Sequence, residues 1–165
     1  GHCIPIDPFL LSWKAKQFKM KTRFIELSGK VNETMPSLIV SKMIALHNKE
    51  IKKKPNILIV GAAYKKNVDD IRESPALKIM NILNKKNIKY DYLDPFVKEI
   101  SNSRQINQKI KSISLRYNLI SKYTLTAIIT DHDKLDYSKI LKHSKLVLDT
   151  RGRYAFDKSE KIIQA

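Results

Sequence analysis

Residues 57–76 read I-L-I-V-G-A-A-Y-K-K-N-V-D-D-I-R-E-S-P-A, and much of the predicted fold follows from this stretch. A short apolar run that ends in glycine, then a polar loop, then Ser-Pro opening an amphipathic segment is typical of a strand that leads through a loop to a helix N-terminus. In open α/β sheets such loops lie beyond the carboxyl ends of the strands. Lys65, Lys66 and Arg72 could therefore hold an anion, although a solvated basic loop is an equal alternative from residue types alone.

The rest of the chain from residue 56 alternates between strand and helix patterns. Helices are predicted over 75–86, 117–123 and 136–142, and strands over 56–61, 88–93, 111–115, 125–130 and 146–149. This alternation predicts an α/β fold, a Rossmann-like parallel sheet with helices on both faces. Residues 97–111 fit either a helix or a loop, and the tail from Asp157 is expected to be frayed.

The first part of the chain is predicted to be helical. Asp7 is a good N-cap for a helix that starts at Pro8 and ends near Phe18. This helix is expected to bury Phe9, Leu10 or Trp13 on one face.

A second helix is predicted from about residue 21 to about residue 48. Its apolar residues recur at helical spacing and are expected to pack along its length, with a kink or restart near Pro36; they are Phe24, Leu27, Val31 and Met35. A basic linker follows. The predicted organisation is thus a helical segment over 1–52 and a Rossmann-like domain over 53–165.

Composition narrows the classes of function. The chain has 165 residues and a formal net charge of +16, which is compatible with phosphates or anionic substrates. Its lysines are spread along the sequence and no nucleic-acid-binding motif is found, so a lysine-coated surface is favoured over a nucleic-acid binder. No apolar run reaches the ~18 residues of a membrane span. One cysteine and scattered histidines predict neither a disulfide nor a metal site.

Candidate chemical groups lie at both ends of the chain. Cys3 stands near a predicted helix N-terminus, where a thiolate nucleophile is favoured, although a small buried hydrophobic residue is the more common role. Asp7 could orient a water, but capping alone explains it. The Asp-His-Asp run over 131–133 follows a predicted strand and is assigned a structural role, whereas Arg151 is the better candidate for a second anion contact. The Gly61 loop lacks G-x-G-x-x-G, so it is not predicted to bind a dinucleotide.

Six motifs occur in the order of a known family. They are G-H-C-I-P-I-D-P over 1–8, N-E-T-M-P over 32–36, the sixteen-residue run over 61–76, Y-L-D-P over 92–95, T-D-H over 130–132 and D-T-R-G over 149–152. Together they resemble the C-terminal half of the UDP-glucose/GDP-mannose dehydrogenase family, and the resemblance covers nearly the whole chain. The first motif is similar to the branch that oxidises UDP-N-acetylhexosamines such as UDP-N-acetylmannosamine and UDP-N-acetylglucosamine, with His2 as its marker.

The resemblance implies a reaction and a cellular setting. Members of the family oxidise the sugar C6 alcohol to a carboxylate with two NAD, in the cytoplasm, for polysaccharide biosynthesis. Cys3 would be the nucleophile that forms a thiohemiacetal and then a thioester, and Asp7 would assist thioester hydrolysis. The family's N-terminal NAD-binding domain is missing from this sequence, so the chain alone is expected to be inactive. A non-catalytic UDP-sugar or phosphate-binding module is the alternative.

The resemblance also implies binding residues and a partner. Tyr64 and Lys65 would bind the UDP-sugar substrate, and Arg151 would contact the nucleotide sugar. Arg72 would reach the NAD cofactor of a neighbouring subunit. The helix from 21 to 48 would mediate a homodimer or a higher homo-oligomer.

Overall fold

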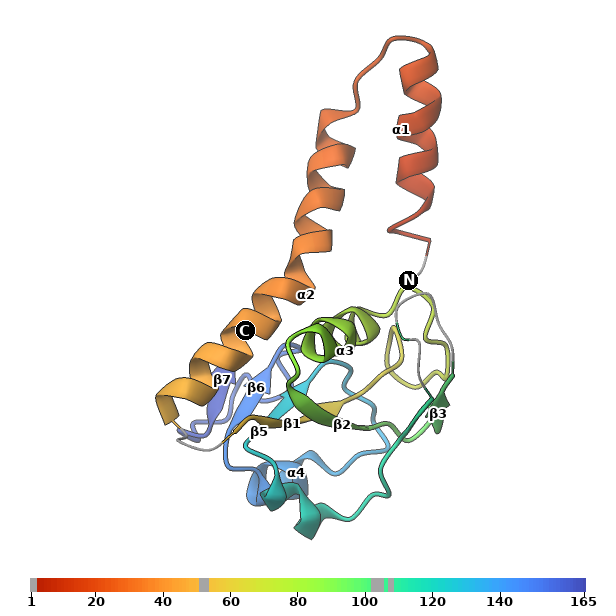
Figure 1. Ribbon diagram of the computed structural model, residues 1–165. Helices are drawn as coiled ribbons and strands as arrows, with labels where there is room; N and C mark the ends of the chain where they lie inside the picture. The colour runs from red at the N-terminus through yellow and green to blue at the C-terminus, as the bar shows by residue number, and fades with distance from the viewer. Residues whose placement is uncertain (1–2, 51–53, 102–105, 107–108) are drawn as a thin grey trace.

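The computed structural model describes residues 3–50, 54–101, 106 and 109–165. A parallel β-sheet domain forms the body of the molecule, and a long helical hairpin rises from it (Figure 1). The hairpin consists of α1 (Asp7–Gln17) and α2 (Arg23–Glu50), and the C-terminal half of α2 packs on the sheet domain. No helix in the described ranges combines the length and apolar character needed to cross a membrane.

The main sheet has five parallel strands in the order β2-β1-β5-β6-β7. They are β1 (Asn56–Val60), β2 (Lys89–Leu93), β5 (Leu125–Ile128), β6 (Val147–Asp149) and β7 (Ile162–Gln164). The chain passes from β1 to β2 on one side and then returns to β5 on the other side of β1. Such a reversal leaves a crevice at the carboxyl ends of the two strands, where open α/β folds bind their ligands.

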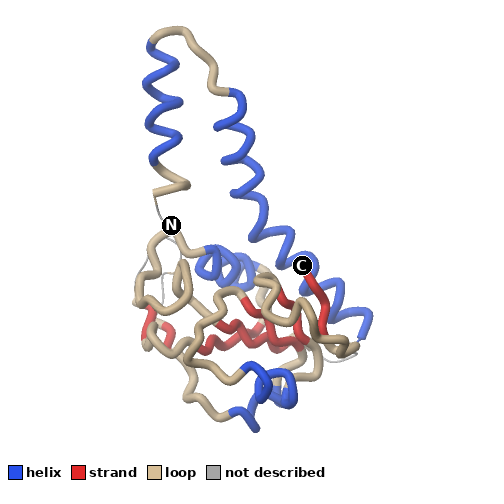
Figure 2. Tube along the Cα trace, turned by 180° about the vertical axis from the view of Figure 1, so that it is seen from behind, coloured by secondary structure: helices blue, strands red, loops and turns tan. Residues whose placement is uncertain are grey.

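Helices cover both faces of the sheet (Figure 2). α3 (Pro75–Lys85) and α2 lie on one face, and α4 (Tyr137–His143) with the 3₁₀ helix η1 (Tyr117–Lys122) lies on the other. Along β1, Ile57 and Ile59 enter the first apolar cluster, whereas Leu58 and Val60 enter the second. Because side chains alternate between the faces of a strand, a strand covered on both faces needs a continuous apolar run.

The strand-loop-helix prediction is confirmed in its details. Gly61 has φ +87°, and a Cβ there would lie 2.2 Å from the Thr130 carbonyl oxygen, so only glycine fits between β1 and β5. Ser74 accepts a hydrogen bond from the Ala76 N–H at 3.2 Å, and Pro75 opens α3. The α/β fold class and the parallel sheet are therefore as predicted.

Two predictions for the sheet domain are wrong. Instead of a strand over 111–115, only Ile110–Lys111 (β4) is extended, and it pairs antiparallel with Glu99–Ile100 (β3) outside the main sheet. Ser112 and Ile113 are instead bound to the end of β2, where the Ile113 N–H donates to the Tyr92 carbonyl at 2.9 Å. The tail is not frayed, since β7 pairs in parallel with β6 and its apolar side chains cover that edge.

The hairpin also departs from the predictions. Helix α1 begins at Asp7 itself, and its N-cap residue Ile6 makes no side-chain capping bond, so Asp7 is not the cap. Leu10 and Trp13 are 60% and 63% exposed, although α1 packs against α2. Phe9 is 37% exposed, and its ring fills the space above Gly29.

Of the predicted kink or restart, the restart does not occur: helix α2 runs through Pro36, and both views show its axis bending partway along (Figures 1 and 2). The apolar stripe on its N-terminal half does not pack along its length: Phe24, Leu27, Val31 and Met35 are all exposed. The predicted domain boundary at residues 52 and 53 and the marker His2 fall outside the described residues.

Candidate functional site

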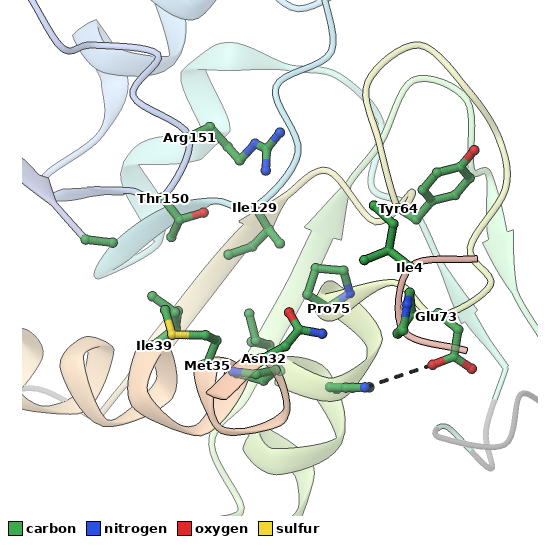
Figure 3. A pocket seen from close by; sticks show the side chains of 15 residues that line it. Ile4, Asn32, Met35, Ile39, Tyr64, Glu73, Pro75, Ile129, Thr150 and Arg151 are labelled. Atoms are coloured by element: carbon green, nitrogen blue, oxygen red, sulfur yellow. Dashed lines mark ion pairs between the residues drawn. The ribbon is translucent and has the colours of Figure 1, made fainter. Parts of the chain in front are cut away.

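A cavity of about 430 Å³ opens between the hairpin and the carboxyl edge of the sheet. It is lined by the turn before α1, the middle of α2, the loop after β1, the start of α3 and the residues that follow β5 and β6 (Figure 3). It therefore borders the point where the strand order reverses between β1 and β5. This is the position at which the fold is expected to hold a ligand.

Two of the predicted binding residues line this cavity from different strands. Tyr64 comes from the loop after β1, and Arg151 comes from the segment after β6. In Figure 3 the Arg151 guanidinium points from its strand end toward the side of the cavity where Tyr64 lies. The Arg151 Nε lies 3.5 Å from Asp131 Oδ1, and its backbone N–H donates to Asp149 Oδ1 at 2.9 Å. The half-exposed guanidinium is thus oriented, yet open to a ligand.

The loop after β1 has three cations with different surroundings. Lys66 Nζ lies 3.5 Å from Asp133 Oδ1, and Arg72 binds Asp70 with its Nη2 2.6 Å from Oδ2. The hydrogen bond and charge of Asp70 raise the pKa of Arg72 above its ordinary value. Within the described part of the chain, Lys65 pairs with no carboxylate, and its Nζ lies 5.6 Å from the centre of the Tyr64 ring. Lys65 is not among the described lining residues, but it directly follows one.

Cys3 is exposed and free, and the two residues after it, Ile4 and Pro5, line the cavity. The Cys3 carbonyl accepts hydrogen bonds from the N–H groups of Ile6 and Asp7 at 3.0 and 2.8 Å, so a tight turn fixes it to the start of α1. The Arg72 guanidinium lies within electrostatic range of Cys3. Cys3 thus directly precedes two residues of the cavity that Tyr64 and Arg151 line, while the Asp7 side chain is exposed in the first turn of α1.

A buried carboxylate lies directly beneath the loop after β1. Asp94 Oδ2 accepts hydrogen bonds from the N–H groups of Ala62 and Ala63 at 2.7 and 3.2 Å, and His132 Nε2 lies 2.9 Å from the same oxygen. Asp94 Oδ1 accepts from the N–H groups of Phe96 and Val97 at 2.8 and 2.9 Å. Burial alone would raise the pKa of Asp94, but these hydrogen bonds outweigh burial and hold that pKa below its ordinary value.

This arrangement bears on whether the loop fits a dinucleotide. In a dinucleotide-binding loop, the first backbone N–H groups after the strand point at the pyrophosphate. Here the N–H groups of Ala62 and Ala63 are already bound to the Asp94 carboxylate, which would also repel a phosphate. The loop after β1 therefore does not fit the pyrophosphate of NAD, and an anion at this edge would meet side-chain cations instead.

Sequence reasoning missed three polar residues around the loop and cavity. Asp94 and Asn67 fasten the loop after β1, and Asn32 presents its amide at the cavity wall in Figure 3. Asp94 could have been found, because it follows strand β2 just as Asp131 follows β5. No sequence signal marked Asn67, whose role depends on its φ of +63°. The Asp-His-Asp run supplies the contacts of His132 and Asp133 to this loop.

Comparison with known proteins agrees with this geometry. Residues 58–156 match the model of the UDP-glucose/GDP-mannose dehydrogenase family, UDP binding domain. The chain is 32% identical over 162 residues to the UDP-N-acetyl-D-mannosamine dehydrogenase of Methanococcus vannielii, with 92% of this chain and 34% of the relative covered. It is 28% identical to the UDP-glucose 6-dehydrogenase of Rickettsia bellii, with 98% and 38% covered.

Among solved structures, the UDP-D-ManNAc dehydrogenase of Pyrococcus horikoshii superposes with a TM-score of 0.75 at 26% identity, covering 99% of this chain and 37% of the other. The chain thus spans about a third of the length of the relatives it matches. The family match extends over more than half of the chain and includes the loop after β1 and Arg151. The chain therefore belongs to the UDP-glucose/GDP-mannose dehydrogenase family and contains its UDP-binding domain.

Proposed function

We propose that this chain is the C-terminal part of an NAD-dependent dehydrogenase that oxidises a UDP-N-acetylhexosamine to its uronate through a thioester on Cys3. The observation that carries the proposal is the cavity that Tyr64 and Arg151 line from two strand ends, directly beside the turn that follows Cys3. The relatives of this chain include several UDP-N-acetyl-D-mannosamine dehydrogenases, which favour an N-acetylhexosamine as the sugar.

The cations around the cavity suit the diphosphate of the substrate. Lys65 has no carboxylate partner in the described chain, and Arg151 is about half exposed with only a 3.5 Å contact to Asp131. Both can turn toward an anion without breaking a close ion pair. A phosphate held by such groups gains charge-assisted hydrogen bonds, with Arg suited to bidentate contacts. In the proposed complex, Lys65 and Arg151 bind the diphosphate and Tyr64 flanks the sugar.

Cys3 would carry the covalent step. After the C6 alcohol has been oxidised, the Cys3 sulfur adds to the aldehyde carbon and forms a thiohemiacetal. Removal of a hydride gives a thioester, and water then releases the carboxylate and the free thiol. Asp7, whose backbone N–H is bound to the Cys3 carbonyl, is proposed to orient that water. NAD would accept the hydrides, bound mainly by a domain outside this chain, and Arg72 is proposed to reach the cofactor of a neighbouring subunit.

Replacing the nucleophile tests this mechanism. In the full-length protein, Cys3→Ala should abolish uronate formation while UDP binding by calorimetry stays within about twofold of the parent, because the exposed thiol is not a nucleotide contact. The parent should reduce two NAD per UDP-N-acetylhexosamine. Undiminished uronate production by the alanine variant would refute the assignment of Cys3.

The second candidate is a non-catalytic module that binds a UDP-sugar or a phosphate. Residues 58–156 match the UDP-binding family model, and the relatives are about three times longer than the chain. The same two assays separate the candidates. A parent protein that binds UDP but reduces no NAD with any UDP-N-acetylhexosamine would favour the module.

The exposed hairpin supports a proposed partner. Large apolar side chains are exposed on both α1 and the first half of α2, including Trp13, Phe24 and Leu27. Exposed apolar surface on this scale favours an interface with another protein surface. We propose that a second copy of the chain covers it, as a homodimer or within a higher homo-oligomer.

A further inference from the structure

We infer that Asp94 and His132 are positioning residues that hold the loop after β1 on both sides of Tyr64 and Lys65. The inference rests on the proposed function, in which these two loop residues contact the nucleotide sugar. Neither Asp94 nor His132 is among the described residues that line the cavity. They would act through the backbone of the loop and not by touching the substrate.

The near side of the loop is tied to Asp94. The carboxylate accepts the N–H groups of Ala62 and Ala63 at 2.7 and 3.2 Å, and Thr130 Oγ1 donates to the Ala63 carbonyl at 2.7 Å. All of these groups are buried. The backbone is therefore fixed up to the residue before Tyr64.

The far side of the loop is tied to His132. The Asn67 N–H donates to His132 Nδ1 at 3.0 Å. The Asn67 side chain donates from Nδ2 to Asp133 Oδ2 at 2.6 Å and accepts from the Asp133 N–H at 3.0 Å. Asn67 has φ +63°, a conformation that needs such support in a residue other than glycine.

The His132 ring joins the two ties. It is fully buried, and both of its nitrogens are engaged, Nδ1 with the loop and Nε2 with Asp94. Because Nδ1 accepts a hydrogen bond, the ring is neutral and carries its proton on Nε2. The centroids of the Phe96 and His132 rings lie 5.2 Å apart, and this packing restricts rotation of the His132 ring. The strand ends of β2 and β5 thus set the position of the loop together.

The consequence concerns binding affinity. Tyr64 and Lys65 lie in the short segment between Ala63 and Asn67, so little freedom is left to them while both ties hold. If one tie opens, only a fraction of the molecules keeps the binding geometry, and the apparent dissociation constant rises by the inverse of that fraction. A structural role in the core alone would change stability without changing the affinity for UDP.

Two replacements of His132 separate these roles, because each keeps one nitrogen position. An asparagine amide reaches about as far as Nδ1, and a glutamine amide about as far as Nε2. His132→Gln should therefore lose the acceptor for the Asn67 N–H and weaken UDP binding about tenfold, whereas His132→Asn should weaken it about threefold or less. Calorimetric titration of UDP measures both. Equal affinity in His132→Gln and the parent would overturn the inference.

A matched control removes a partly buried hydrogen bond at the other end of β5. The Tyr123 hydroxyl donates to Asp91 Oδ2 at 2.6 Å, far along the strand from the loop. Tyr123→Phe should lower the melting temperature and leave the UDP affinity unchanged. If it weakens UDP binding as much as His132→Gln does, general loosening of the core accounts for the result and the inference fails.

Amide hydrogen exchange keeps the inference separate from the proposed function. In His132→Gln, the amide of Asn67 should exchange at least about tenfold faster than in the parent, whether or not UDP binds. A parent that binds no UDP, with this faster exchange in the variant, would refute the function and leave the positioning role. Unchanged exchange would overturn the positioning role. Should His132→Gln not fold, Asp94→Asn tests the other tie, because its amide nitrogen cannot accept the N–H groups that a carboxylate oxygen accepts in the parent. It should weaken UDP binding about threefold, and unchanged affinity would contradict the inference.

Discussion

The sheet domain and the helical hairpin carry similar apolar side chains in opposite environments. All four apolar residues of β1 are fully buried, between clusters that close over both faces of the sheet. On the hairpin, Trp13, Phe24 and Leu27 are 63%, 84% and 59% exposed. The sheet domain and the C-terminal half of α2 thus share a closed core, whereas α1 and the first half of α2 present apolar side chains to the outside. The cavity with Tyr64 and Arg151 lies where the two parts meet.

The largest expected difference is in the free energy of unfolding when one large aliphatic side chain is shortened to alanine in each part. Ile59→Ala should lower the free energy of unfolding by about 2–5 kcal/mol, because Ile59 is fully buried and its loss leaves a cavity. Leu27→Ala, on the exposed stripe, should change it by about 0.5 kcal/mol or less in dilute solution. Urea unfolding of both variants measures the difference. Equal losses would show that the hairpin stripe is buried in solution even at high dilution.

The polar interior of the sheet domain provides the next test. Asp94→Asn should lower the free energy of unfolding by about 2–3 kcal/mol at pH 7, because an amide cannot accept all five hydrogen bonds that converge on the carboxylate. The pKa of Asp94 is lower in the folded state than in the unfolded chain. The stability that its ionised form contributes is therefore complete above about pH 5 and is lost as the pH falls below about 4.

Urea unfolding at several pH values checks this sign. The difference in free energy of unfolding between the parent and Asp94→Asn should shrink as the pH falls below about 4. A difference that stays constant down to about pH 2 would mean that the Asp94 charge does not carry the stabilisation.

The hairpin surface yields a third, smaller effect. If a second copy covers it, Phe24→Asp should raise the dimer dissociation constant by about tenfold or more, since a charge would be buried at an apolar contact. Lys30→Asp, on the same helix, is the control for added negative charge. Sedimentation equilibrium measures both. A parent chain that stays monomeric at high concentration would contradict the proposed partner.

The same contrast explains what could be predicted from the sequence. Ser74-Pro75 and the glycine after β1 specify a local turn and a helix start, so the strand, the loop and α3 were predicted almost to the residue. The helical spacing of Phe24, Leu27 and Val31 predicted the second helix correctly, but it does not say what covers their apolar side chains. β7 was missed because three residues in a polar tail become a strand only when the edge of β6 is available.

The candidate site divides in the same way. The rule that ligands bind at the carboxyl ends of strands pointed to Arg151 and to the loop after β1, whereas the family resemblance named Tyr64 within that loop. Tyr64 and Arg151 line one cavity. The contact of His132 with Asn67 spans 65 residues of sequence and depends on a left-handed backbone conformation. Such a contact follows from the strand order, which periodicity alone does not give.

Titration of UDP into the Lys65→Ala variant tests the central claim most directly. Lys65 and Lys66 are neighbours in the loop, but Lys66 is paired with Asp133 and Lys65 has no carboxylate partner in the described chain. The proposed site predicts that Lys65→Ala raises the dissociation constant for UDP about tenfold, which corresponds to about 1.4 kcal/mol, and that Lys66→Ala changes it about twofold or less. Equal affinities of the parent and Lys65→Ala would contradict the assignment of this loop to the nucleotide.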